Sequence, residues 1–141
     1  MEIVQVVMDT NVLIAALRSK YGASFKLLSL VDSNHFKINL SVPLALEYEE
    51  VAKRENQQGA IPDEDIDNIL DFLCRVANFH EIFFLWRPYL KDFKDDFVFE
   101  LAMAAGCDII ITYNKKDFKG VEKFGIRVLT PKEFLEERGI I

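Results

Sequence analysis

Three acidic side chains stand at points of the chain where carboxylates could gather around a cation. Asp9 directly follows an apolar run, Glu47 comes soon after a second run, and Asp96 opens a segment that leads to a third. Carboxylate oxygens are preferred ligands of hard divalent cations such as Mg²⁺ and Mn²⁺. Two such cations can activate a water and stabilise the leaving oxygen of a phosphodiester. That chemistry is available only if the fold brings the three acids together.

A structural role could explain two of these acids without any chemistry. Asp9 stands where a strand is expected to meet a helix, so its carboxylate could simply cap that helix. Glu47 lies near a helix start, where the helix dipole favours an acid. The pair Asp95-Asp96 differs, because two adjacent carboxylates repel each other and a bound cation would relieve the repulsion. One of the pair is expected to cap the following helix, on which Glu100 shares a face with Asp96.

A fourth polar position follows the apolar segment 108–113. Asn114 comes at the end of that segment, with Thr112 just before it and Asp117 just after it. A turn alone would explain the sequence Asn-Lys-Lys-Asp. The pair Lys115-Lys116 could also contact phosphate, so the structural and functional interpretations both stay open here.

The elements that must position these side chains alternate between strands and helices. Strands are expected at Ile3–Met8, Phe36–Leu40, Glu81–Leu85, Asp108–Tyr113 and Ile126–Leu129. Helices are expected at Thr10–Leu17, Ser24–Val31, Leu44–Lys53, from Pro62-Asp63 onward, at Asp96–Ala105, and from Thr130-Pro131 to Gly139, with a polar loop at Arg87–Lys94. This alternation predicts an α/β sandwich around a mainly parallel sheet. Carboxyl ends of parallel strands meet at one edge, where the acids and the Asn114 region should converge.

Several residues mark the expected helix ends. Ser24, Ser41 and Thr130 have side chains that suit an N-cap, and Pro43 suits a first helical turn. Gly106 is a natural residue just beyond a helix C-terminus, because it adopts the left-handed conformation without strain.

The composition predicts one globular, soluble domain spanning residues 1–141. Half of the residues are hydrophobic and 28% are charged, as in ordinary globular chains. No apolar run reaches the roughly 18 residues of a membrane span, and the first residues lack the pattern of a signal peptide. A cytoplasmic location without a membrane partner is therefore expected. Cys74 and Cys107 are far apart and have no ligand-spaced neighbours, which argues against a zinc site.

The net charge of −6, with a pI near 4.9, argues against a nucleic-acid binder when it is taken alone. Phosphate binding normally requires a basic surface. The objection weakens if several acids cluster to hold divalent cations, because such a site becomes electropositive once the cations are bound. Composition does not choose between these two interpretations.

Five stretches of the sequence together resemble the PIN-domain family. They are Val6-Val7-Met8-Asp9-Thr10-Asn11-Val12-Leu13-Ile14, Ser41-Val42-Pro43 leading to Glu47, Asp95-Asp96-Phe97-Val98-Phe99-Glu100-Leu101-Ala102, Gly106-Cys107-Asp108-Ile109-Ile110-Ile111-Thr112, and Asn114-Lys115-Lys116-Asp117-Phe118. The resemblance covers essentially the whole chain. It implies a PIN-like, three-layer α/β/α sandwich and a Mg²⁺- or Mn²⁺-dependent ribonuclease. Single-domain members are commonly VapC-like toxins of type II toxin–antitoxin pairs, which usually form homodimers and are inhibited by a small antitoxin.

The resemblance also implies a set of site residues. Carried over by position, the catalytic and metal-binding acids are Asp9, Glu47 and Asp96. The fourth family position falls at Asn114, an amide in place of the commoner Asp, so either Asp117 substitutes or Asn114 holds a metal-bound water. Thr10, Asn11, Glu100 and Thr112 are expected to orient the ligands or contact phosphate.

Other families fit less well, and one alternative stays open. A phosphatase of the haloacid-dehalogenase type requires a second acid two residues after Asp9, where this chain has Asn11. A response-regulator receiver requires an acceptor Asp after its third strand and a later Lys, and no such pair stands out. The stronger alternative is a PIN-like module without catalysis that binds RNA or a protein, which Asn114 and the acidic pI support.

Overall fold

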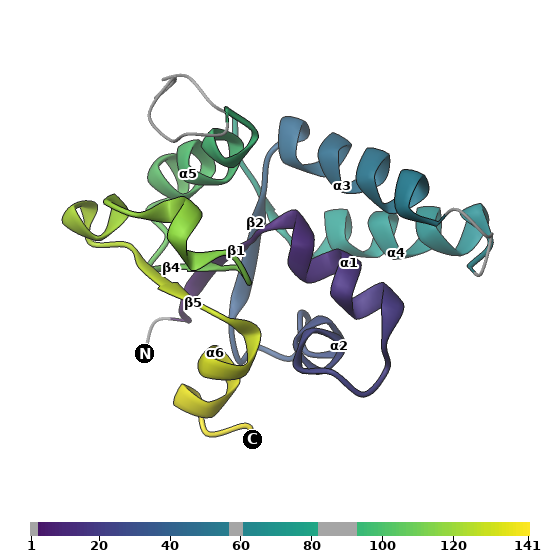
Figure 1. Cartoon of the computed structure of the whole chain (residues 1–141), viewed down its shortest axis with the longest axis horizontal. Helices are drawn as coiled ribbons and strands as arrows, with labels where there is room; N and C mark the ends of the chain where they lie inside the picture. The colour runs from purple at the N-terminus through teal and green to yellow at the C-terminus, as the bar shows by residue number, and fades with distance from the viewer. Residues whose placement is uncertain (1–2, 57–60, 82–92) are drawn as a thin grey trace.

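A parallel five-stranded sheet forms the centre of the structure, a computed structural model that describes residues 3–56, 61–81 and 93–141, with residues 93–96 described by their backbone alone (Figure 1). The strands are β1 (Gln5–Met8), β2 (Lys37–Leu40), β3 (Asn78–Phe79), β4 (Ile109–Ile111) and β5 (Arg127–Leu129). Their order in the sheet is β3-β2-β1-β4-β5, and neighbouring strands run parallel.

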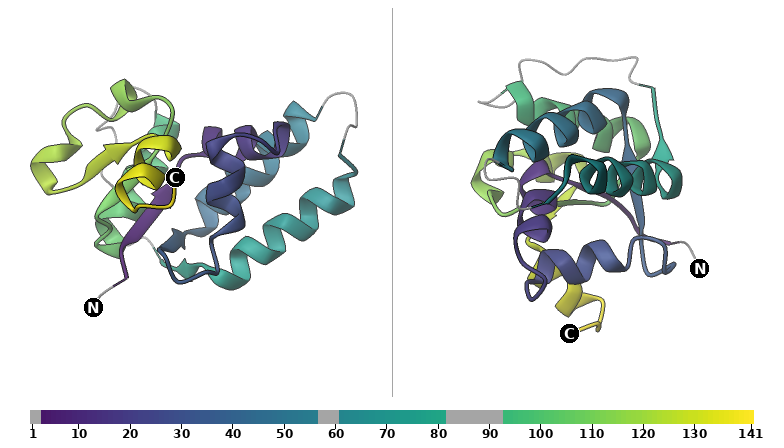
Figure 2. Two further views of the ribbon diagram at one scale, coloured as in Figure 1. Left: turned by 90° about the horizontal axis from the view of Figure 1, so that it is seen from below. Right: turned by 90° about the vertical axis from the view of Figure 1, so that its right-hand side faces the viewer.

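Helices cover both faces of this sheet. They are α1 (Thr10–Arg18), α2 (Ala23–Ser29), α3 (Val42–Glu55), α4 (Asp63–Val76), α5 (Phe93–Ala105) and α6 (Pro131–Glu137), with the 3₁₀ helices η1 (Lys115–Phe118) and η2 (Val121–Phe124). Helix α5 contacts β1, β2 and β4, and it lies on one side of the strands while α1, α3 and α4 lie on the other (Figure 1). Figure 2 shows α2 beside α1, which it contacts, and α6 reaches α2 from β5. The expected three-layer α/β/α sandwich is confirmed.

The neighbouring strands β1 and β4 place the candidate residues at one edge of the sheet. Val6, Val7 and Ile110 are fully buried, as expected for strands covered by helices on both faces. Met8 of β1 pairs with Ile111 of β4, so these strands end side by side. The chain continues from β1 to β2 on one side and returns to β4 on the other. In open α/β sheets, ligands bind at the carboxyl ends where the order reverses in this way.

Most of the expected helix ends are confirmed. Ser41 caps α3 by accepting a hydrogen bond from the Leu44 amide, and Pro43 lies in the first turn. Thr130 caps α6 in a reciprocal capping box with Glu133. Gly106, with a φ of 64°, ends α5 in the left-handed conformation.

Ser24 is not the cap that the sequence suggested. Helix α2 begins at Ala23 after Gly22, so Ser24 lies inside the helix, and no side chain caps it. The Ser24 hydroxyl instead lies 2.5 Å from the hydroxyl of Tyr113, which follows β4. A contact that is distant in sequence therefore outweighs the local capping preference.

Two further boundaries differ from expectation. Helix α5 begins at Phe93, so Asp95 and Asp96 lie in its first turns and neither is its N-cap; Phe93 and Lys94 are helical rather than loop. The third strand is Asn78–Phe79, which pairs with Asn39 and Leu40 of β2. Glu81 lies beyond this strand, while the rest of the strand expected at Glu81–Leu85, and most of the expected loop at Arg87–Lys94, lie outside the described residues. Among the described helices, none is long and apolar enough to cross a membrane.

Candidate active site

Asp9 is held at the end of β1 by more contacts than a helix cap requires. The side chain is only 8% exposed. Its Oδ1 accepts a hydrogen bond from the Thr10 amide at 2.8 Å, which is the N-cap interaction of α1. Its Oδ2 accepts hydrogen bonds from the Thr112 hydroxyl at 2.7 Å and from the side-chain Nδ2 of Asn11 at 3.2 Å. The capping role is real, but the second oxygen is fixed by groups that a cap does not need.

The electrostatic surroundings of Asp9 favour a nearby positive charge. Burial raises the pKa of its carboxyl group from 3.8 to about 6. The hydrogen bonds from Thr112 and from the Thr10 amide oppose this increase, while the neighbouring charges of Glu47 and Asp117 add to it. An acid whose pKa is raised by burial and by like charges is typical of functional sites.

Two contacts hold Glu47 near Asp9, one from α3 to the start of α1 and one from α3 to the end of β1. The Thr10 hydroxyl donates a hydrogen bond of 2.6 Å to Glu47 Oε2. The next residue, Tyr48, is buried, and its hydroxyl donates to the Met8 carbonyl oxygen. Glu49 and Glu50 behave differently, because both are exposed and form ion pairs one turn along α3 with Lys53 and Arg54. These two acids therefore belong to the solvated face of α3.

The segment after β4 completes the arrangement. The buried Thr112 hydroxyl donates to Asp9 and accepts from the backbone amide of Asn114 at 3.0 Å. Asn11 donates to the same hydroxyl at 3.3 Å and accepts from the Tyr113 amide. The Asp117 amide in turn donates to the Asn114 carbonyl oxygen at 3.0 Å. Thr112 therefore links Asp9 to the turn that carries the fourth predicted position.

Four of the five predicted metal-binding residues line one cavity of about 600 Å³. These are Asp9, Glu47, Asn114 and Asp117, together with the predicted orienting residues Thr10 and Asn11. Their donor atoms are carboxylate and amide oxygens, which suit a hard divalent cation better than zinc. The oxygen atoms that line the cavity are therefore of the type that the predicted cation prefers.

The other predicted acids contribute less to the described cavity. The backbone of Asp96 lies in α5, but its side chain is outside the described residues. Glu100 is 2% exposed in the same helix and does not line the cavity. Among the described side chains, no three His, Cys, Asp or Glu form a group that could hold a metal ion. The proposed set of three acids thus depends on Asp96.

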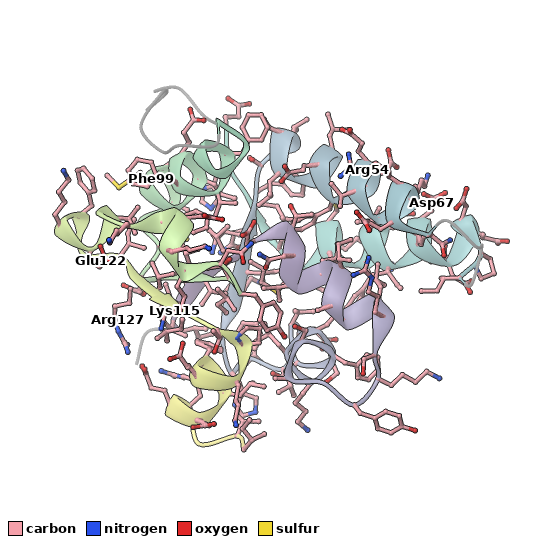
Figure 3. All side chains as sticks on the ribbon, in the orientation of Figure 1. Arg54, Asp67, Phe99, Lys115, Glu122 and Arg127 are labelled. Carbon is pink, nitrogen blue, oxygen red and sulfur yellow. The ribbon has the colours of Figure 1, made fainter. Side chains whose placement is uncertain are left out.

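Sequence reasoning missed the basic residues of this cavity. Arg18 of α1 and Arg54 of α3 both line it, as does Glu55. Helical spacing could have revealed them, because Arg18 is seven residues after Asn11 and Arg54 is seven residues after Glu47. By contrast, Lys115 donates to both carboxylate oxygens of Glu133 on α6. Figure 3 labels Lys115 and Arg54, which lie well apart on the molecule.

Both the sequence and the fold of this chain are similar to those of known proteins. A family described as "PIN domain" matches residues 5–116, well over half of the chain. No curated protein matches the sequence. The structure is similar to a chain of the crystal structure of VapBC2 from Rickettsia felis bound to a DNA fragment from their promoter, with a TM-score of 0.61. The match covers 88% of this chain and 96% of that chain at 14% identity, so it shows a shared fold.

Proposed function

Because the chain belongs to the PIN-domain family, we propose that it is a metal-dependent endoribonuclease that hydrolyses phosphodiester bonds in RNA. PIN domains are generally nucleases that use divalent metal ions. The observation that carries the proposal is the buried Asp9 carboxylate, held by Thr112 and Asn11 in a cavity that Glu47 also lines. A carboxylate that serves only as a cap has no need of these partners.

In this proposal the catalytic residues Asp9, Glu47 and Asp96 hold a divalent cation, with Asn114 and Asp117 as further ligands. Bound there, Mg²⁺ or Mn²⁺ would lower the pKa of a water and neutralise charge that develops on the phosphodiester. The chain itself supplies orientation, and the residues that do so are Thr10, Asn11, Glu100 and Thr112. Thr10 fixes one oxygen of Glu47, and Thr112 fixes one oxygen of Asp9, so neither carboxylate must be reoriented before it binds.

The decisive experiment is cleavage of single-stranded RNA with Mn²⁺ or Mg²⁺, using Glu47→Gln and Asp96→Asn. Each change keeps the side-chain shape but removes a carboxylate, so we expect a loss of roughly 100-fold or more in kcat/KM. Glu49→Gln is the matched control, since Glu49 lies on the same helix, is exposed and pairs with Lys53. It should cleave like the wild type.

The competing function is a PIN-like module that binds RNA or a protein without cutting. Asn114 favours it, because an amide stands where the resemblance leads us to expect an acid. If the wild type and Asp96→Asn leave the RNA equally intact with Mn²⁺ present, the nuclease proposal fails. Binding of the intact RNA, measured by fluorescence anisotropy, would then support the module.

We further propose that the chain is the toxin of a type II toxin–antitoxin pair, acting in the cytoplasm as a homodimer. The support is the fold shared with a chain of VapBC2, which in its own crystal structure is bound to promoter DNA. A short neighbouring reading frame that encodes a DNA-binding protein would support a small antitoxin partner. Light scattering should give twice the chain mass of 16.3 kDa for the purified protein, and a mass of one chain would contradict the dimer.

A further inference from the structure

The cavity that holds the acids has a second end of opposite charge. Asp9 and Glu47 lie at or near the beginnings of α1 and α3, while Arg18 and Arg54 lie in the last turns of the same helices. All four residues line the same cavity, and α1 and α3 contact each other. With a rise of 1.5 Å per residue, each arginine lies roughly 10–14 Å along its helix from the acid.

Both arginines are exposed and form ion pairs with acids of α3. Arg18 Nη2 lies 2.7 Å from Glu55 Oε2, and Arg54 Nη1 lies 3.7 Å from Glu50 Oε1. Exposed pairs of this kind contribute little to stability. A guanidinium group also binds phosphate through two parallel hydrogen bonds. Phosphate can therefore replace the carboxylate as the partner of either arginine at small cost.

We propose that Arg18 and Arg54 bind a phosphate of the RNA strand away from the bond that is cut, so that the strand follows the cavity between α1 and α3. This inference rests on the proposed nuclease function and specifies how its substrate lies. A distance of roughly 10–14 Å is longer than one nucleotide step, so a strand that reaches both ends must carry a further phosphate besides the one at the acids. A dinucleotide with one phosphate is too short to reach both ends of the cavity.

The Arg18–Glu55 pair allows a test in which the two partners should have opposite effects on RNA binding. If Arg18 binds phosphate, Glu55 competes with it, so Arg18→Gln should weaken RNA binding and Glu55→Gln should strengthen it. If the pair only stabilises the helices, both changes break the same contact and act in the same direction. The Arg127–Glu137 pair is a close match, with side-chain exposures of 55% and 37% against 63% and 39%. Arg127 does not line the cavity, and it lies well away from Arg54 in Figure 3.

The experiment measures cleavage of a hexanucleotide and a dinucleotide by the full chain over a range of salt concentrations. For the hexanucleotide, Arg18→Gln and Arg54→Gln should each raise KM roughly 10-fold, with little change in kcat, and reduce the salt dependence. Glu55→Gln should lower KM a few-fold, and Arg127→Gln should leave it unchanged. Cleavage of the dinucleotide should not respond to any of these changes.

Three outcomes would overturn the inference while leaving the nuclease function intact. They are unchanged hexanucleotide kinetics in both arginine variants, equal losses on the dinucleotide, and a Glu55→Gln variant that weakens binding as Arg18→Gln does. If the wild type cuts nothing with Mn²⁺, the proposed function fails separately. Anisotropy of a labelled hexanucleotide in Ca²⁺ then tests the same opposite signs without any cleavage, and equal affinities would refute the role of the arginines.

Discussion

Asp9 shows what a single residue reveals from its sequence position and what it does not. Its place after an apolar run predicted both a cap and a possible ligand, and the capping hydrogen bond from the Thr10 amide is present. The partner that separates the two roles is Thr112, which lies 103 residues away. No local pattern contains that contact, because it arises only when β1 and β4 end side by side. The local sequence therefore predicted the carboxylate, whereas only the family resemblance pointed to Thr112 as a residue that orients it.

The pKa of Asp9 makes a testable prediction for the protein without metal. The folded state holds this proton up to about pH 6, whereas the ordinary pKa is 3.8. The stability that Asp9 contributes at low pH should therefore be lost as the pH rises through 6. About 2 pKa units correspond to an upper limit of about 3 kcal/mol. Asp9→Asn has no such titration.

Thermal unfolding in EDTA between pH 4 and pH 8 measures this effect. Other groups titrate in both proteins, so the informative quantity is the stability of Asp9→Asn minus that of the wild type. This difference should increase with pH, because the variant avoids burying a charge. A difference that stays constant over the whole range would show that the Asp9 carboxyl group is not destabilised by burial.

At the scale of elements, the sequence predicted the buried strands and capped helices well. Residues 6–8 of β1 and all of β4 are apolar and buried, and Ser41 and Thr130 cap their helices through local hydrogen bonds. The two-residue β3 has no such signal, because both of its residues are exposed and show no alternation of buried and exposed side chains. The start of α5 was misjudged because Asp95-Asp96 looked like a cap, although acids are equally suited to a first helical turn.

The contact between Tyr48 of α3 and Met8 of β1 should position Glu47, although Tyr48 itself is not a proposed ligand. Tyr48→Phe removes the hydroxyl that donates to the buried Met8 carbonyl. We expect a loss of about 1–3 kcal/mol in unfolding free energy, because the carbonyl is left without this partner. Cleavage should fall roughly 10-fold, since Glu47 is displaced from Thr10.

Urea unfolding and RNA cleavage together test the Tyr48 prediction. Tyr21→Phe is the control, because Tyr21 is 99% exposed and its hydroxyl faces solvent. It should match the wild type in both measurements. Equal stability of Tyr48→Phe and the wild type would mean that the Met8 carbonyl finds another partner and that this contact does not position α3.

At the scale of the whole molecule, the net charge hides how charges are distributed around the cavity. A charge of −6 argued against nucleic-acid binding, yet the cavity has acids at one end and Arg18 and Arg54 at the other. Composition averages over such a distribution. The seven-residue spacings from Asn11 to Arg18 and from Glu47 to Arg54 indicate it instead. On this basis a cation and the arginines together, rather than an overall basic surface, would attract an RNA strand.

The same distribution predicts that a divalent cation stabilises the entire fold. Ligands that bind only the folded state stabilise it by about 2.7 kcal/mol at 100 times their Kd. For a chain of this size, that free energy corresponds to an increase in Tm on the order of 10 °C. Burial of the Asp9 carboxylate and, to a lesser extent, the nearby charge of Glu47 disfavour the ionised site, and a bound cation would offset both. Differential scanning fluorimetry with increasing Mn²⁺ measures this increase in Tm, with Glu47→Gln/Asp96→Asn as the variant that should not respond.

Arg127→Gln is the control that should respond like the wild type, because its side chain lies outside the cavity. An equal increase in the wild type and the double variant would place the cation elsewhere on the molecule.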